Sequence, residues 1–126
     1  MSTTTVRQYR VHARSTDTFG RVLAGCRQHH VVVDGPVENG CPGEAITPAE
    51  LFLAGVAACG VELLQVIARD RGDVLDAVEA EIEGTLDRAN PVREDVTVFN
   101  SVRLSLTLRG VEQDQARRLV EAFKAR

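Results

Sequence analysis

The chain has 126 residues, which is enough for one domain with one hydrophobic core. A composition of 44% hydrophobic and 26% charged residues excludes an intrinsically disordered chain. The net charge is -3 and no block of basic residues occurs, so nucleic acid is not expected as a partner.

The sequence shows no sign of export or membrane insertion. The first five residues lack the charged and apolar regions of a secretory signal. We find no run of about 18 apolar residues, so no membrane partner is expected. Three cysteines, Cys26, Cys41 and Cys59, form no CxxC pair, and an odd number is untypical of a secreted disulfide framework. We therefore expect a cytoplasmic protein with reduced thiols.

The residues up to about Asp34 are predicted to form three short strands. Apolar and polar residues alternate from Tyr9 to Ala13, which is the period of a half-buried strand. Glycines interrupt the next run, and Val31–Val33 is a short β-branched strand stopped by the turn sequence Asp34-Gly35-Pro36. The short connections predict an antiparallel meander.

A long helix is predicted after a loop over residues 35–46. Thr47-Pro48-Ala49-Glu50 combines an N-cap threonine, a proline at the first helical position and a glutamate at the third, which is a capping box. Gly72 is the expected end. Between Leu51 and Ile67 only two residues are strongly polar, so we expect the helix to be buried on most sides. One layer of strands covers one side, and a second copy of the chain is expected to cover the rest.

Two strands and a helix are predicted after Gly72. Apolar residues alternate with glutamates over residues 78–86, and with Arg, Ser and Thr over residues 102–108. Residues 116–123 follow helical spacing. The order β-β-β-α-β-β-α predicts an α+β fold, with a largely antiparallel sheet packed on a long central apolar helix, in a single domain over residues 1–126.

Cys59 is the residue whose surroundings suggest chemistry. It follows the small residues Gly55-Val56-Ala57-Ala58, and Gly55, one turn earlier on the same apolar face, leaves a notch beside the thiol. An apolar substrate would fit there. The alternative interpretation is that Cys59 only packs, because free cysteine is among the most buried residue types.

A reactive thiol must be a thiolate near neutral pH, which requires a nearby positive charge. Cys59 lies too far along the helix to use the N-terminal dipole. The candidate cations are Arg21, Arg27, His29 and His30. Glu50 is nine residues before Cys59, on the opposite side of the helix, so its expected role is to close the capping box. A catalytic role for Glu50 would require it to orient an arginine.

A zinc site is a weaker prediction. Cys26 and His29 are three residues apart, a spacing that puts them on opposite faces of one strand. We therefore expect no metal and no bound cofactor.

Two sequence blocks resemble the OsmC/Ohr family of osmotically inducible and organic-hydroperoxide-resistance proteins. They are His29-His-Val-Val-Val-Asp34-Gly-Pro36 and Thr47-Pro-Ala-Glu-Leu-Phe-Leu-Ala-Gly-Val-Ala-Ala-Cys59. The hydroperoxide-resistance branch usually has Glu directly after the proline. Here Ala49 holds that place and Glu50 follows, so the resemblance is nearer to the generic OsmC-like branch.

The resemblance implies an intertwined homodimer and peroxidase chemistry. Cys59 matches the cysteine that attacks the O–O bond and becomes a sulfenic acid. In the family an arginine stabilises the thiolate and a glutamate holds the arginine, and for these roles we assign Arg21, with Arg27 as the other candidate, and Glu50. An external thiol, such as a lipoylated protein, is the expected reductant.

The family's second cysteine follows the last helix, and the sequence stops at Arg126, where that cysteine and a final strand would come. Three alternatives stay open. The sequence continues to that cysteine, or Cys26 or Cys41 forms the disulfide with Cys59, or an external thiol alone reduces the oxidised Cys59. The expected function is a thiol-dependent peroxidase that reduces organic hydroperoxides through Cys59. The alternatives are a non-catalytic module of the same fold, which binds a small ligand or senses redox state, and a structural role with three inert cysteines.

Overall fold

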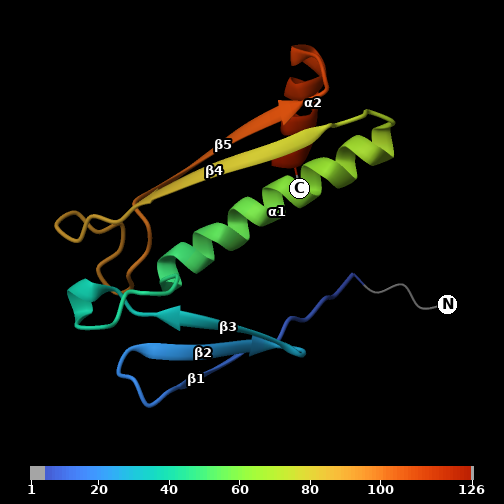
Figure 1. Cartoon of the computed structure of the whole chain (residues 1–126). Coiled ribbons are helices and arrows are strands. Elements are labelled where there is room, and N and C mark those ends of the chain that lie inside the picture. The colour runs from blue at the N-terminus through green and yellow to red at the C-terminus, as the bar shows by residue number, and fades with distance from the viewer. Residues whose placement is uncertain (1–4, 126) are drawn as a thin grey trace. The chain divides into compact units, whose positions relative to one another are not determined.

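The computed structural model describes residues 5–125 and confirms the predicted order of elements (Figure 1). The chain forms two compact units, residues 1–51 and residues 52–126. The elements are β1 (His12–Ser15), β2 (Arg21–Cys26), β3 (His29–Asp34), the short 3-10 helix η1 (Val37–Asn39), α1 (Pro48–Arg71), β4 (Ala77–Thr85), β5 (Ser101–Arg109) and α2 (Gln113–Lys124).

The first unit contains the predicted antiparallel meander, with strand order β1-β2-β3. Strands β2 and β3 are joined by a two-residue turn in which Arg27 has a φ of 57°. This turn places Cys26 directly opposite His29 in the register. The prediction that these two residues lie on opposite faces of one strand is therefore wrong, because paired residues of neighbouring strands share a face.

The loop after β3 is held against the meander by backbone hydrogen bonds and by Cys41. The amide of Asp34 donates to the carbonyl of Ile46 at 3.0 Å, and that of Gly35 donates to the carbonyl of Gly20 at 2.8 Å. A Cβ atom at either Gly20 or Gly35 would lie 2.5 Å from the Cys41 sulfur. The two glycines therefore leave the space in which the Cys41 thiol packs.

The helix α1 begins and ends where the sequence predicts. The Thr47 amide donates to a Glu50 carboxylate oxygen at 3.0 Å, and the Glu50 amide donates to the Thr47 hydroxyl at 3.4 Å, which is the predicted capping box. At the other end Gly72 takes a φ of 77°, a left-handed conformation that ends a helix. The first turn of α1 belongs to the first unit and the remainder to the second.

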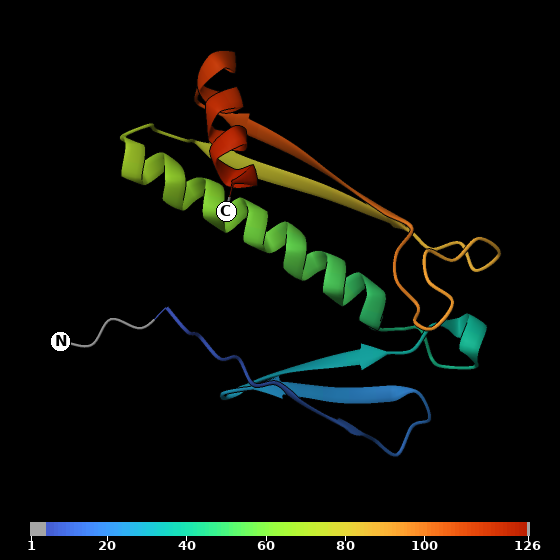
Figure 2. The same cartoon turned by 180° about the vertical axis from the view of Figure 1, so that it is seen from behind.

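In the second unit, α1 lies along the β4–β5 hairpin, and α2 packs at the same core (Figures 1 and 2). The predicted alternation is confirmed, with Val78, Ala80 and Ile82 half-buried and the intervening glutamates exposed. The antiparallel pairing is also confirmed, and the strands divide between two sheets. The fully buried residues of this core are Leu64 of α1 and Leu119 of α2.

The second unit covers one side of α1. The buried residues of the helix are Gly60, Leu64, Ile67 and Ala68, so one layer covers one side as expected, and cover of the other sides by a second copy stays a prediction. By length and composition, α1 is long and apolar enough to cross a membrane. The prediction that the sequence contains no such stretch is therefore wrong. The core helix of a soluble protein can have the same length and apolar composition. The side of α1 that carries Leu64 packs in the core of the second unit.

Candidate functional site

Cys59 lies on the outer face of α1, with its thiol free and the residue exposed. The face that packs on the hairpin carries Gly60, Leu64 and Ile67, whereas Phe52, Gly55 and Val56 share the exposure of Cys59. A Cβ atom at Gly55 would meet no heavy atom within 4 Å outside its own helix. The second unit by itself therefore leaves the sulfur accessible, beside the apolar notch that the sequence predicts.

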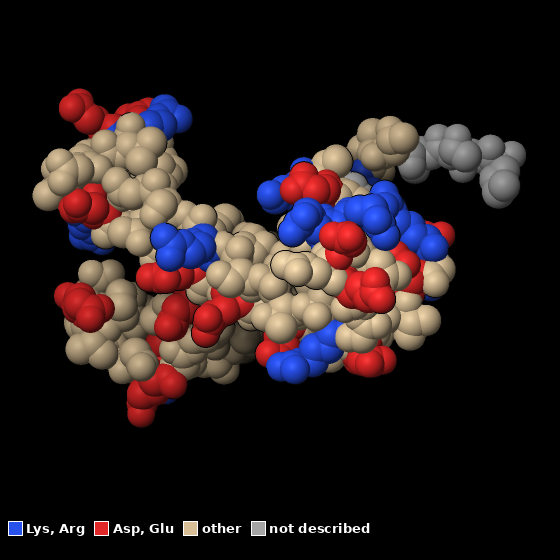
Figure 3. All heavy atoms as spheres, turned by 90° about the horizontal axis from the view of Figure 1, so that it is seen from above, with Lys and Arg blue, Asp and Glu red and all other residues tan. Residues whose placement is uncertain are grey.

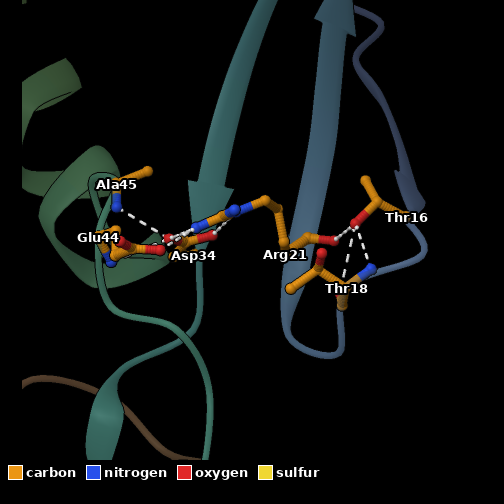
Figure 4. A network of polar contacts seen from close by, with 6 residues as sticks. All are labelled: Thr16, Thr18, Arg21, Asp34, Glu44 and Ala45. Carbon is orange, nitrogen blue, oxygen red and sulfur yellow. Dashed lines mark hydrogen bonds and ion pairs between the residues drawn. The ribbon is translucent and has the colours of Figure 1, made fainter.

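Arg21 begins β2 and reaches across to the end of β3 (Figure 4). Its Nε donates to Oδ1 of Asp34 at 2.8 Å and its Nη2 donates to Oδ2 at 2.9 Å, which is the two-pronged geometry that guanidinium and carboxylate favour. The same Nη2 also donates to Glu44 at 2.9 Å. Arg21 is opposite Asp34 in the β2–β3 register, so strand pairing itself brings the two side chains together.

Asp34 is the most deeply buried charged residue of the described chain, with a side chain that is 0% exposed. Its Oδ2 also accepts the backbone amides of Glu44 and Ala45, each at 2.9 Å. The hydrogen bonds from Arg21 hold the pKa of Asp34 far below its usual range, and those from the two amides act in the same direction, while desolvation opposes them. The pKa of Arg21 is raised, chiefly by its hydrogen bonds with Asp34 and Glu44.

Sequence reasoning missed both carboxylates on Arg21. Asp34 precedes Gly35-Pro36 and was expected to be a turn residue, and Glu44 lies in a loop with no motif of its own. The signal that identifies Asp34 is its position opposite Arg21, which becomes visible only once the turn between β2 and β3 is known. Together these residues fasten the loop of residues 35–46 to the meander.

Glu50 accepts hydrogen bonds from Thr47 at the start of α1. Its carboxylate accepts the amide of Thr47 at 3.0 Å and the Thr47 hydroxyl at 2.9 Å. These two hydrogen bonds, the one from the amide first, lower the pKa of Glu50. Among the described residues no ion pair joins Glu50 to an arginine, and the carboxylates on Arg21 are those of Asp34 and Glu44.

The other candidate cations lie at the far end of β2 from Arg21. Arg27 is in the turn after β2, and His29 and His30 open β3. Five residue steps along a strand separate Arg21 from Cys26, which corresponds to about 17 Å. Arg21 and Arg27 therefore occupy well-separated positions, and one thiol at a fixed place can be near only one of them.

The three predicted site residues fall on both sides of the division between the units. Arg21 and Glu50 belong to residues 1–51, and Cys59 belongs to residues 52–126. That a guanidinium lies near the Cys59 sulfur stays a prediction. Cys26 and Cys41, the candidates for a second redox cysteine, are both free and half-buried.

No group of three or more His, Cys, Asp or Glu residues that could hold a metal ion is found in residues 5–125. On the face of the molecule seen in Figure 3, basic and acidic side chains are interspersed among uncharged residues.

Comparison with known proteins places the chain among OsmC-like proteins. The model of the family described as OsmC-like protein matches residues 41–126. The search of curated proteins found no match.

Several solved structures share the fold. An OsmC-like protein from Mycoplasma pneumoniae has a TM-score of 0.81 at 15% identity, covering 95% of this chain and 82% of that one. A protein from Legionella pneumophila, described as the organic hydroperoxide resistance protein OsmC and a predicted redox protein, has a TM-score of 0.69 at 26% identity, covering 95% and 84%. An organic hydroperoxide resistance protein from Elizabethkingia anophelis has a TM-score of 0.68 at 18% identity, covering 96% and 84%.

The family match extends from the loop that carries Cys41 and Glu44, through α1 with Cys59, to the last residue, and the solved structures extend the likeness of fold to nearly the whole chain. The chain therefore belongs to the family of OsmC-like proteins.

Proposed function

We propose that this protein is a thiol-dependent peroxidase that reduces organic hydroperoxides through Cys59. The observation that carries the proposal is the exposed Cys59 thiol on an apolar helix face that the second unit leaves uncovered, beside the space left by Gly55. An apolar approach to the sulfur favours an organic peroxide over hydrogen peroxide. The solved relatives from Legionella pneumophila and Elizabethkingia anophelis are named organic hydroperoxide resistance proteins, which supports the same substrate class here.

The proposed reaction has two stages. The Cys59 thiolate attacks the distal oxygen of the hydroperoxide, the O–O bond breaks, and the alkoxide leaves and takes up a proton to become an alcohol. The sulfur is oxidised by two electrons to a sulfenic acid. A thiol then displaces water from the sulfenic acid to form a disulfide, and a further thiol, or the second thiol of a dithiol, releases Cys59 in its reduced form.

We also propose that the working form is a homodimer. The Phe52 ring stacks on Phe99 of the same unit, with the ring centroids 6.2 Å apart, yet Phe52 is 61% exposed and Val56 is 38% exposed. The second unit therefore leaves much of this face without cover. Exposed apolar side chains that lie together on one helix face mark an interaction surface. Sedimentation velocity of the wild type over a range of concentrations would detect the dimer, and Val56→Asp, which keeps the stacking of Phe52 on Phe99, is expected to shift the distribution toward monomer.

The decisive experiment compares two peroxides. Reduced protein is mixed with stoichiometric cumene hydroperoxide or hydrogen peroxide, and thiol loss is followed by stopped-flow and by intact mass after trapping with dimedone. We expect rapid addition of one dimedone at Cys59, faster with the organic peroxide, and no addition in Cys59→Ser. Oxidation no faster than that of free cysteine would contradict the peroxidase proposal and favour the non-catalytic binding or sensing module.

Two matched variants separate the attacking cysteine from a second redox cysteine. Cys26→Ser and Cys41→Ser are each expected to keep the sulfenic acid step. If one of them also loses the later disulfide, that cysteine is the internal partner of Cys59. If neither does, the reductant is external, and turnover should then depend on the concentration of an added dithiol.

A further inference from the structure

A pocket lies on the β1–β2–β3 meander of the first unit. It has a volume of about 670 Å³ and is lined by the extended segment before β1 and by strands β1 to β3. Three of its side chains are guanidinium groups, those of Arg10, Arg14 and Arg27. None of the described residues that line it is acidic, although the whole chain carries a net charge of -3.

Strand pairing brings part of this lining to one face of the sheet. His12, Gly25 and His30 are paired across the three strands, so they form one row on the same face of the sheet. Gly25 has no side chain, and a Cβ atom there would lie 3.2 Å from the His30 ring. The missing side chain creates a hollow between two imidazoles, and Arg14, two residues after His12, lies on the same face.

The arginines of this pocket differ from Arg21 because they have no anionic partner in the described part of the chain. None of the ion pairs formed within residues 5–125 includes Arg10, Arg14 or Arg27. Three guanidinium groups that face one hollow without a carboxylate repel one another, and a bound anion would relieve this repulsion. Guanidinium binds phosphate and carboxylate through paired N–H donors, so the charge and the donors both select an anion.

We propose that this pocket binds a small organic molecule that carries a phosphate group. The doubly charged phosphate matches three guanidiniums better than a single carboxylate does. The organic part is indicated by the remaining lining, since Leu23 provides an apolar floor and the exposed ring of Tyr9 provides a wall. The volume lies within the range of about 300–1,000 Å³ that is typical of small-molecule sites.

The direct test is calorimetric titration of the full chain at low salt with three probes that share one ring: phenyl phosphate, benzoate and benzyl alcohol. We expect saturable binding of phenyl phosphate that weakens as salt is added, and affinity for benzoate that is lower by about tenfold or more. No saturable binding of phenyl phosphate, or equal affinity for benzoate, would overturn the proposal.

Variants locate the binding. The double variant Arg10→Gln, Arg14→Gln is expected to lose at least about tenfold in affinity, because two of the three guanidinium donors are gone. The double variant Arg103→Gln, Arg109→Gln, on β5 in the other unit, also removes two exposed arginines and is the matched control that should bind as the wild type does. Circular dichroism verifies that both double variants are folded. Equal affinity in the Arg10→Gln, Arg14→Gln variant and the wild type would place the anion elsewhere and refute the site.

Cys26 supplies an independent readout, because it also lines the pocket. Phenyl phosphate should slow the alkylation of Cys26 by anionic iodoacetate more than its alkylation by neutral iodoacetamide, as judged by peptide mass spectrometry, because a bound anion offsets the positive charge of the pocket. If phenyl phosphate leaves the ratio of these two rates at Cys26 unchanged, the proposal is contradicted.

Discussion

Replacing Gly55 tests the proposed approach of the substrate to Cys59. Gly55 lies one turn before Cys59 on the exposed face, and no heavy atom outside its helix lies within 4 Å of the position where a Cβ atom would be. The second unit therefore accepts a larger side chain there without a clash. Glycine in a helix interior is less favourable than alanine by about 1 kcal/mol, so Gly55→Ala should raise the free energy of unfolding by about that amount.

The larger variant, Gly55→Leu, is expected to separate the two peroxides. A leucine side chain fills the notch and removes the surface against which an organic group packs. If about 60 Å² of apolar substrate area loses its contact, at about 25 cal/mol per Å², the transition state loses about 1.5 kcal/mol. This corresponds to roughly a tenfold slower oxidation by cumene hydroperoxide. Oxidation by hydrogen peroxide, which has no apolar part, should change by less than about twofold.

Gly60→Ala is the matched control on the opposite face of α1. A Cβ atom at Gly60 would lie 3.5 Å from Leu104 and 3.5 Å from Phe123, which is ordinary van der Waals contact. This variant should gain stability in urea denaturation while its ratio of the two peroxide rates stays at the wild-type value. The reasoning is refuted if Gly55→Leu leaves the ratio unchanged, or if Gly60→Ala lowers it as much.

Three further predictions concern stability, measured by urea denaturation. Leu64→Ala, at a side chain that is 0% exposed, should cost about 2–5 kcal/mol, and a smaller loss would mean that the core collapses around the cavity. Gly84→Ala should cost about 1–3 kcal/mol, because a Cβ atom there would lie 2.8 Å from the ring of Phe99, and a neutral result would show that the ring moves aside. Since the pKa of Asp34 is lowered on folding, its contribution is complete above the unfolded value of about 4 and is lost as the pH falls below it. Stability should therefore fall more steeply with acid in the wild type than in Asp34→Asn, and parallel curves would contradict this.

The elements of this fold could be predicted because each carries a local signal. The capping box from Thr47 to Glu50 starts α1 as expected, and the alternation over residues 102–108 corresponds to β5. Hydrogen bonds and side-chain periodicity over a few residues determine these features, and a single sequence contains them. The apolar run of α1 was also evident, but how much of it is buried depends on what covers the helix and is not a local property.

The features that escaped prediction depend on which strands face each other. Arg27 takes a left-handed φ in the turn after β2, in place of the glycine or asparagine that usually marks a hairpin. Without that turn, neither the Cys26–His29 pair nor the ion pair between Arg21 and Asp34 could be inferred, although the residues of the second pair are only 13 positions apart. Both pairs follow from the register of β2 against β3, and tertiary packing determines that register.

The charge around Arg21 bears directly on the proposed chemistry. Arg21 contributes one positive charge, whereas Asp34 and Glu44 contribute two negative charges, so the three side chains together would disfavour a thiolate beside them. Asp34 is buried and accepts two hydrogen bonds from Arg21. The Glu44 side chain, in contrast, is 77% exposed, and exposed ion pairs contribute little to stability. Glu44 is therefore the partner that Arg21 can most easily release.

Replacing Glu44 by glutamine can thus identify the cation that serves Cys59. If Arg21 is that cation, Glu44→Gln removes a competing anion, and oxidation of Cys59 by cumene hydroperoxide should become faster by several-fold at low salt, with less gain at high salt. If Arg27 is the cation, it lies at the other end of β2, about 17 Å away, and Glu44→Gln should leave the rate unchanged while Arg27→Gln lowers it. A rate unaffected by Glu44→Gln, Arg21→Gln and Arg27→Gln alike would show that neither arginine ionises Cys59. The peroxidase proposal would then lose its physical basis.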